Sequence, residues 1–124
     1  MKVLLVDDDA MLRSMLKIGL QGHGFQVLDA SSGAEALTLA QAQPIDVLVA
    51  DVVMGYMDGW TLAASLVKQY PDLPVLFISG YTVDFESKRQ SYPRSAFLQK
   101  PFLIGKLVDA IADLSGALKK QKAG

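Results

Sequence analysis

The sequence contains no cysteine, so disulfide bonds and thiolate metal sites are excluded. No apolar run approaches the ~20 residues of a membrane-spanning helix. Acidic residues follow the first apolar run at once, unlike the layout of a signal peptide. The formal net charge of −1 provides no positive excess for nucleic acid or an anionic membrane surface. These absences predict a cytoplasmic protein without direct binding to nucleic acid or membrane.

The length and composition fit a single globular domain. A chain of 124 residues can bury one hydrophobic core. Hydrophobic residues make up 51% of the chain and charged residues 20%, which is typical of soluble proteins. We expect one domain over 1–118 and a flexible tail over 119–124, the stretch "KKQKAG".

Short apolar runs alternate with helical patterns along the chain. The runs are rich in Val, Ile, Leu and Phe and are mostly apolar on both faces, which is typical of parallel strands covered on both sides. Leu12, Met15, Leu16 and Leu20 are expected to share one face of the first helix, which Asp9 can cap. The five predicted strands are 3–6, 25–30, 46–50, 75–79 and 96–99, and further helices are predicted after Ser32, after Asp58 and from Ile104 onward.

This alternation predicts an α/β fold with right-handed crossovers. Five strands fit a flavodoxin-like, doubly wound parallel sheet of order 2-1-3-4-5 with helices on both faces. The segment 82–94, "TVDFESKRQSYPR", departs from the pattern because it is polar and because Pro93 ends any helix there. We expect a short or mobile element at that point.

Polar residues follow four of the predicted strands at their carboxyl ends, where such sheets gather their functional groups. Taken singly, each has a plain structural explanation: a solvated strand end, a helix cap, a turn serine or a surface lysine. From spacing alone, a solvated pair of acids is as good an interpretation of the first group as a binding site. Together they are expected to share one pocket: Asp7, Asp8 and Asp9 after the first strand, Asp51 after the third, Ser79 at the end of the fourth and Lys100 after the fifth.

Three carboxylates in one pocket repel one another. Two unit charges ~4 Å apart interact by ~1 kcal/mol in water and ~4 kcal/mol at an effective dielectric constant of 20. A hard divalent cation relieves this repulsion, and a site with few carboxylates and room for water favours Mg²⁺. With Lys100 it would accept an anion such as phosphate, and a carboxylate beside the cation could attack phosphorus to give an acyl phosphate.

Four stretches together make the chain resemble a response-regulator receiver domain over essentially its whole length: "LLVDDDAMLR", "DVLVADVVMGYMDGW", "LFISGYT" and "FLQKPF". The last two look most similar to receiver domains attached to hybrid histidine kinases. The resemblance implies a two-component or phosphorelay signalling function. A histidine kinase or histidine phosphotransfer protein would donate the phosphoryl group, and a partner that the sequence leaves unidentified would respond. The domain would be a phosphoacceptor rather than an enzyme.

The resemblance also implies residue roles at the acidic pocket. Asp51 would be the phosphoacceptor. Asp8 would bind Mg²⁺ directly, and Asp7 would bind it directly or through water. The backbone carbonyl of Val53 would be a further ligand.

The implied switch involves the fourth and fifth strands. Lys100 would pair with the phosphoryl group, and the family commonly has a cis peptide before the following residue, Pro101. Ser79 would turn its hydroxyl toward a phosphoryl oxygen, and Phe97 would rotate between exposed and buried states. Core packing is an almost equally good interpretation of Phe97.

Two departures from the family pattern bear on function. Gly55 stands where proline is usual, which predicts a looser loop. Segment 82–94 is a poor helix where the output helix should lie, which puts the usual output surface in question. Val53 and Tyr81 occupy positions that often tune phosphoryl lifetime, and neither can readily orient an attacking water. We therefore hypothesise a persistent phosphorylated form.

Two alternatives compete with the phosphoacceptor. A phosphohydrolase of the haloacid-dehalogenase kind needs a second aspartate two residues after its nucleophile, and Asp7 and Asp9 have that spacing. The chain is too short for a substrate cap, however, and this interpretation leaves Asp51 and "QKPF" unexplained. A pseudo-receiver that only binds partners is the other alternative, although all the key groups are present.

Overall fold

The computed structural model describes the backbone of residues 1–123 and the side chains of residues 1–116. The side chains of the expected flexible tail, 119–124, lie outside the described part, so the tail stays a prediction. Strands and helices alternate along the described chain, with one 3-10 turn before the last strand. The elements are β1 (Lys2–Val6), α1 (Ala10–Gly22), β2 (Gln26–Ala30), α2 (Gly33–Ala42), β3 (Val47–Asp51), α3 (Gly59–Gln69), β4 (Val75–Ser79), α4 (Phe85–Lys88), η1 (Arg89–Ser91), β5 (Ser95–Gln99) and α5 (Ile104–Ala123).

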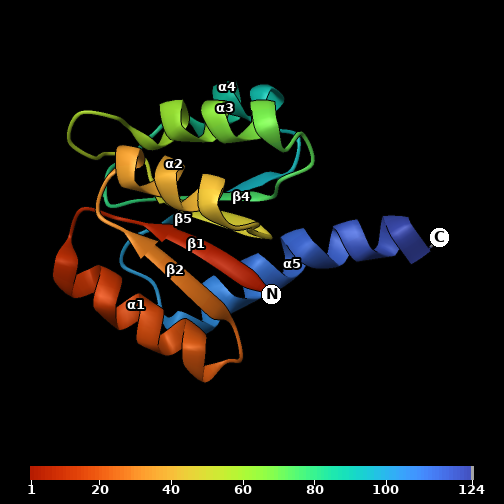
Figure 1. Cartoon of the computed structure of the whole chain (residues 1–124), viewed down its shortest axis with the longest axis horizontal. Helices are drawn as coiled ribbons and strands as arrows, with labels where there is room; N and C mark the ends of the chain where they lie inside the picture. The colour runs from red at the N-terminus through yellow and green to blue at the C-terminus, as the bar shows by residue number, and fades with distance from the viewer. Residues whose placement is uncertain (124) are drawn as a thin grey trace.

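The five strands form one parallel sheet in the order β2-β1-β3-β4-β5, which confirms the predicted fold. Helices α1 and α5 cover one face of the sheet, and α2, α3 and α4 cover the other (Figure 1). Within the described residues, no helix is both long and apolar enough to span a membrane.

The sheet divides the interior into two hydrophobic layers because successive side chains of a strand point to opposite faces. Leu4 and Val6 of β1 pack in the layer beneath α2 and α3, and Val3 and Leu5 pack beneath α1 and α5. Two of the three interior strands, β3 and β4, are buried along their whole length. This explains their continuous apolar sequences, and it places the carboxyl ends of β1, β3 and β4 on a rigid core.

The helix starts follow the predicted caps. The side chains of Asp9, Ser32 and Asp58 accept hydrogen bonds from backbone amides in the first turns of α1, α2 and α3. The prediction that Met15 lies on the buried face of α1 is wrong, because its side chain is 64% exposed. The inner face of α1 carries residues four apart from Leu12 to Leu20, whereas Met15 shares the outer face with Met11 and Ile18.

Segment 82–94 contains only a one-turn helix, α4, and the 3-10 turn η1. The expectation of a short element is confirmed. This polar segment nevertheless contains two buried aromatic residues that anchor it, since Phe85 and Tyr92 are 7% and 6% exposed. Both side chains belong to the hydrophobic layer on the α2–α3 face.

Candidate functional site

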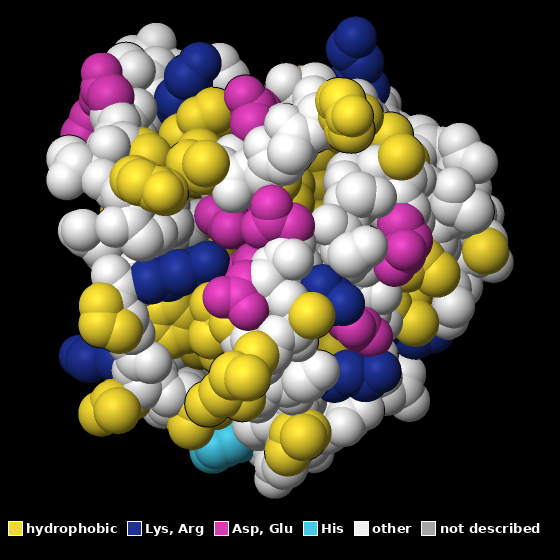
Figure 2. Space-filling view, turned by 90° about the vertical axis from the view of Figure 1, so that its left-hand side faces the viewer, with side chains coloured by type: hydrophobic (Ala, Val, Ile, Leu, Met, Phe, Trp, Pro, Cys, Tyr) yellow, Lys and Arg dark blue, Asp and Glu magenta, His cyan; other side chains and the backbone are white. Residues whose placement is uncertain are grey.

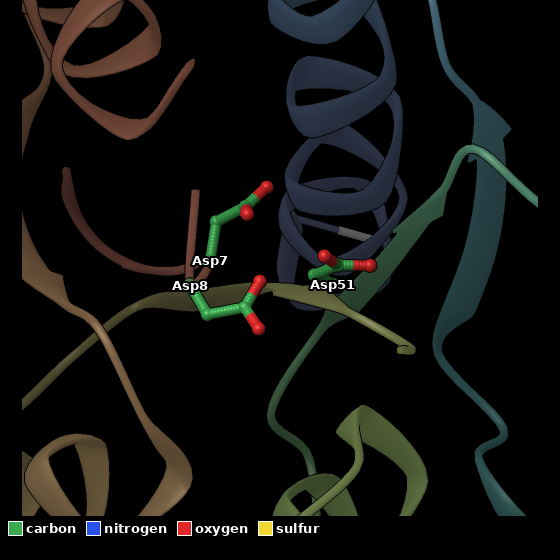
Figure 3. Close-up of side chains that lie close together, drawn as sticks. All are labelled: Asp7, Asp8 and Asp51. Atoms are coloured by element: carbon green, nitrogen blue, oxygen red, sulfur yellow. The ribbon is translucent and has the colours of Figure 1, made fainter. Parts of the chain in front are cut away.

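Asp7, Asp8 and Asp51 meet at the carboxyl edge of the sheet. Val6 at the end of β1 pairs in register with Ala50 of β3, so the aspartates that follow these two residues lie side by side. Asp8 comes from the same loop as Asp7, and the three carboxylates face a common space (Figure 3). One oxygen atom from each lies within 4.8 Å of the other two. This set of hard oxygen donors suits a hard divalent cation.

Lys100, the residue after β5, joins this cluster across the end of β4. Its Nζ atom donates to Asp7 Oδ2 at 2.8 Å and to Asp51 Oδ2 at 3.3 Å. The Lys100 amide donates to the carbonyl of Ser79 at 2.8 Å, which extends the pairing of β5 with β4 by one residue. The peptide bond between Lys100 and Pro101 is cis. The strand order thus brings together residues that are 49 and 93 positions apart in the sequence.

The charges in this cluster do not balance. Burial raises the pKa of Asp51, and the charge of Asp7 raises it further, although Lys100 and the Val53 amide act in the opposite direction. Burial disfavours the charged form of Lys100, but hydrogen bonds and charges from Asp7 and Asp51 outweigh it and raise the pKa of Lys100. Three ionised carboxylates and one ammonium leave two negative charges. A divalent cation would neutralise them.

Asp8 is the accessible member of the cluster. Asp7 is fully buried and Asp51 is 6% exposed, whereas Asp8 is exposed. No side chain or amide in the described part of the chain donates a hydrogen bond to the Asp8 carboxylate. A cavity of about 410 Å³ adjoins it, lined also by Ser31, Ser32, Gly33, Ala34, Met54, Gly55, Tyr56 and Met57. The Asp8 oxygens are therefore free to bind a ligand from this side.

The other predicted site residues lie around the cluster. The Val53 amide donates to Asp51 Oδ1 at 3.2 Å, and the Val53 side chain is 46% exposed. Ser79 is fully buried, and its Oγ atom accepts a hydrogen bond from the Tyr81 amide at 3.0 Å. Phe97 is half-buried and stacks on Phe85, with ring centroids 6.1 Å apart. Phe97 therefore packs against α4.

The face at the carboxyl edge combines acidic and hydrophobic surface. Figure 2 shows acidic side chains near the centre of this face, with basic side chains beside them and hydrophobic side chains around them. Eight large hydrophobic side chains of the described chain are exposed, and four of them belong to loops that border the acidic cluster or follow the strand ends. These four are Val53, Tyr56, Tyr81 and Leu103.

One contact at the site was not anticipated from the sequence. Arg13 of α1 donates from Nη1 to the backbone carbonyl of Asp7 at 2.7 Å and from Nε to Asp29 of β2 at 3.1 Å. A single arginine on a helix has no distinctive sequence signal, because its partner is a carbonyl oxygen that every residue possesses.

Comparison with known proteins identifies the family. The family model of the response regulator receiver domain matches residues 3–112. The chain is 38% identical over 122 residues to the sensor kinase CckA of Brucella abortus, covering 96% of this chain and 13% of that protein. It is 35% identical over 111 residues to the response regulator receiver protein CpdR of the same organism, covering 89% of this chain and 92% of that protein. The chain thus spans a small part of one relative and nearly all of the other.

Solved structures agree with this result. The chemotaxis protein CheY4 of Vibrio cholerae matches with a TM-score of 0.85 and 31% identity, covering 91% of this chain and 97% of that one. The receiver domain of the hybrid histidine kinase CckA matches with a TM-score of 0.78 and 33% identity, covering 92% and 98%. The parallel sheet, the acidic edge and these matches lead to one conclusion: the chain belongs to the response regulator receiver domain family of two-component signalling proteins.

Proposed function

We propose that Asp51 accepts a phosphoryl group from a histidine kinase or a histidine phosphotransfer protein. The observation that carries this proposal is the convergence of Asp7, Asp8 and Asp51 within 4.8 Å, with Lys100 bridging two of them. Asp7, Asp8, Asp51 and the Val53 carbonyl would hold Mg²⁺, whose charge offsets the negative charge that gathers on the transferring group. The donor set and its two uncompensated negative charges fit this ion.

The chemical step is a displacement at phosphorus. An oxygen of Asp51 forms a new bond to phosphorus while the bond from phosphorus to the donor's imidazole nitrogen breaks. The electron pair of that bond stays on the imidazole nitrogen, and the product is an acyl phosphate on Asp51. The ammonium of Lys100 already lies 3.3 Å from Asp51 Oδ2, so it can pair with the incoming phosphoryl oxygens. Lys100 and the backbone thus position the acceptor.

The response would pass through β4 and β5. Phosphorylation adds roughly −1.5 to −2 charges and new acceptor oxygens at the end of β3. The Ser79 hydroxyl would therefore break its hydrogen bond with the Tyr81 amide and donate to a phosphoryl oxygen. Phe97 pairs with Phe77 across these strands and stacks on Phe85 of α4. Rotation of Phe97 would change the α4–β5 surface, which an output partner would read.

The phosphohydrolase alternative is less well supported. Its second aspartate would be Asp9, but the Asp9 carboxylate accepts the Leu12 amide at 3.1 Å and caps α1. The pseudo-receiver alternative would require a missing acceptor or missing metal ligands, whereas Asp7, Asp8 and Asp51 converge. We therefore retain the phosphoacceptor.

Incubation with acetyl phosphate and Mg²⁺, followed by intact-protein mass measurement, tests the proposal. We expect an adduct of one phosphoryl group that is absent in Asp51→Asn and when magnesium is chelated. Asp109→Asn, an exposed change on α5, is the matched control and should still form the adduct. Wild-type protein that takes up no phosphoryl group from this donor would contradict the proposal.

The phosphorylated form is expected to persist. Val53 and Tyr81 are 46% and 67% exposed on the loops after β3 and β4, and neither has the amide or carboxylate group that readily orients an attacking water. The double change Val53→Asn with Tyr81→Glu should shorten the acyl phosphate half-life severalfold. Loss of the acyl phosphate within seconds from the wild-type protein would refute this part.

A further inference from the structure

Arg13 reaches back from α1 over the acidic loop that precedes the helix. Its guanidinium makes two directed hydrogen bonds, to the backbone carbonyl of Asp7 at 2.7 Å and to Asp29 Oδ2 at 3.1 Å. The Arg13 side chain is only 17% exposed. The proposed phosphoryl transfer leaves this residue without a role, although it contacts the backbone of the metal-binding loop.

The carbonyl that Arg13 holds belongs to the peptide group joining Asp7 to Asp8. A peptide group is planar, so a fixed carbonyl oxygen also fixes the plane from which Asp8 departs. The amide and the side chain of Asp7 are anchored as well. The amide donates to the Ala30 carbonyl at 3.2 Å, and Oδ1 accepts a hydrogen bond from the Asp9 amide at 2.9 Å.

Asp8 itself has no comparable anchor. Its carboxylate receives no hydrogen bond from the residues that the structure describes, although it is one of the three converging carboxylates (Figure 3). Its direction is therefore set by its backbone. The contact that fixes the preceding peptide plane is the one from Arg13.

Asp29 of β2 holds the guanidinium in this orientation. It pairs in register with Leu5, two residues before Asp7, so it lies beside the start of the acidic loop. Lys17 Nζ binds the other oxygen of Asp29 at 2.9 Å. Lys17 therefore shares the partner of Arg13 but forms no hydrogen bond or ion pair with Asp7, which makes it a matched control.

We propose that Arg13, oriented by Asp29, is a positioning residue that aims the Asp8 carboxylate at the cation. This inference rests on the proposed function, because it assigns Arg13 to the same metal site. Losing a residue that orients a metal ligand typically weakens metal affinity by roughly 10- to 100-fold. Since Arg13 acts through the backbone, the low end of that range is expected.

The test measures Mg²⁺ affinity by titration calorimetry in Arg13→Gln, Lys17→Gln and wild-type protein. Arg13→Gln should bind Mg²⁺ roughly tenfold more weakly, and Lys17→Gln should match the wild type. Phosphorylation by acetyl phosphate should be slower in Arg13→Gln at limiting Mg²⁺ and should recover at saturating Mg²⁺. Melting temperatures in chelator provide the second readout, because a purely structural role would lower the melting temperature of Arg13→Gln and leave Mg²⁺ affinity unchanged.

The outcomes separate this inference from the proposed function. Wild-type protein that binds Mg²⁺ but takes up no phosphoryl group would contradict the proposed function alone. Unchanged Mg²⁺ affinity in Arg13→Gln would overturn the role of Arg13 alone, and wild-type protein that binds no Mg²⁺ would overturn both. If Arg13→Gln fails to fold, Asp29→Asn takes its place: weaker Mg²⁺ binding than in Lys17→Gln supports the proposal, and equal binding overturns it.

Discussion

The acidic pocket and the α4–η1 segment, which comprises α4, η1 and the following Tyr92, both pack on the sheet, but different interactions hold them in place. In the pocket, two buried carboxylates share one ammonium, and the strands β1 and β3 fix their positions. The α4–η1 segment has one helical turn and a 3-10 turn, and two aromatic side chains anchor it. The pocket depends on the partial compensation of two buried carboxylates by Lys100, whereas the segment depends on packing.

The aromatic anchoring of α4–η1 is concentrated on Phe77 of β4. The ring of Phe85 lies 6.3 Å from the ring of Phe77, and the ring of Tyr92 lies 5.1 Å from it. The Tyr92 hydroxyl also donates to the Trp60 carbonyl at 2.8 Å, which ties the segment to α3. A short element can therefore be ordered without an extended helix.

This difference indicates that the acidic pocket and the α4–η1 segment can contact each other without being equally rigid. The strand ends keep the carboxylates and the Lys100 ammonium in place, while a segment held by two side chains can shift at a modest cost in free energy. The two regions meet along β4 and β5, where Ser79 ends β4 and Phe97 stacks on Phe85 of α4. Perturbing each region separately tests whether they are independent.

The largest effect is expected for Lys100→Met. Removing the ammonium leaves Asp7 and Asp51 as uncompensated buried charges, which typically costs about 3–5 kcal/mol. Urea unfolding in chelator should show this loss in the free energy of unfolding, and excess Mg²⁺ should reduce it. In an Asp51→Asn background the same change should cost less, because one of the two charges is absent. Equal losses in both backgrounds would show that the ion pair between Lys100 and Asp51 does not contribute to the stability of the pocket.

The second effect is expected for Phe85→Ala. Truncating a buried phenylalanine typically costs about 3–5 kcal/mol, and Phe85 should lie at the low end because it borders the core. Hydrogen exchange should accelerate over 84–92 and stay unchanged in β1 and β3. Glu86→Ala, on the exposed side of the same turn, is the control. Exchange that accelerates equally in the strands would contradict the independence of the two regions.

A smaller effect of opposite sign is expected for Asp51→Asn in the absence of metal. Burial raises the pKa of Asp51 above 3.8, so ionising this carboxyl destabilises the folded state. Below pH 3.8 the carboxyl is protonated in both states and this penalty is absent. The penalty grows as the pH rises through the raised pKa. The stability advantage of Asp51→Asn should therefore increase from acid to neutral pH in chelator, and a constant difference would contradict the assigned cause.

Much of this arrangement could be predicted from the sequence. Short runs that are apolar on both faces indicated a parallel sheet. The predicted strand order then placed Asp7, Asp51 and Lys100 at its carboxyl edge. The aromatic anchors escaped prediction because a single turn is too short to show a helical period in residues such as Phe85. The Arg13 contact escaped because backbone carbonyls carry no sequence identity.

The smallest effect is expected between β3 and α3, where Gly55 lies in the connecting loop and Gly59 is the first residue of α3. A Cβ added at Gly55 meets no atom within 4 Å, and the φ angle of Gly55 is not positive. Gly55→Ala should therefore raise the free energy of unfolding by about 0.4–1 kcal/mol, because it restricts the unfolded chain. At Gly59, by contrast, a Cβ would come within 2.5 Å of the Asp51 carbonyl oxygen. Gly59→Ala should destabilise the protein and slow phosphorylation. Paired denaturation and acetyl phosphate assays check this, and equal effects of the two changes would show that a side chain is no more confined at Gly59 than at Gly55.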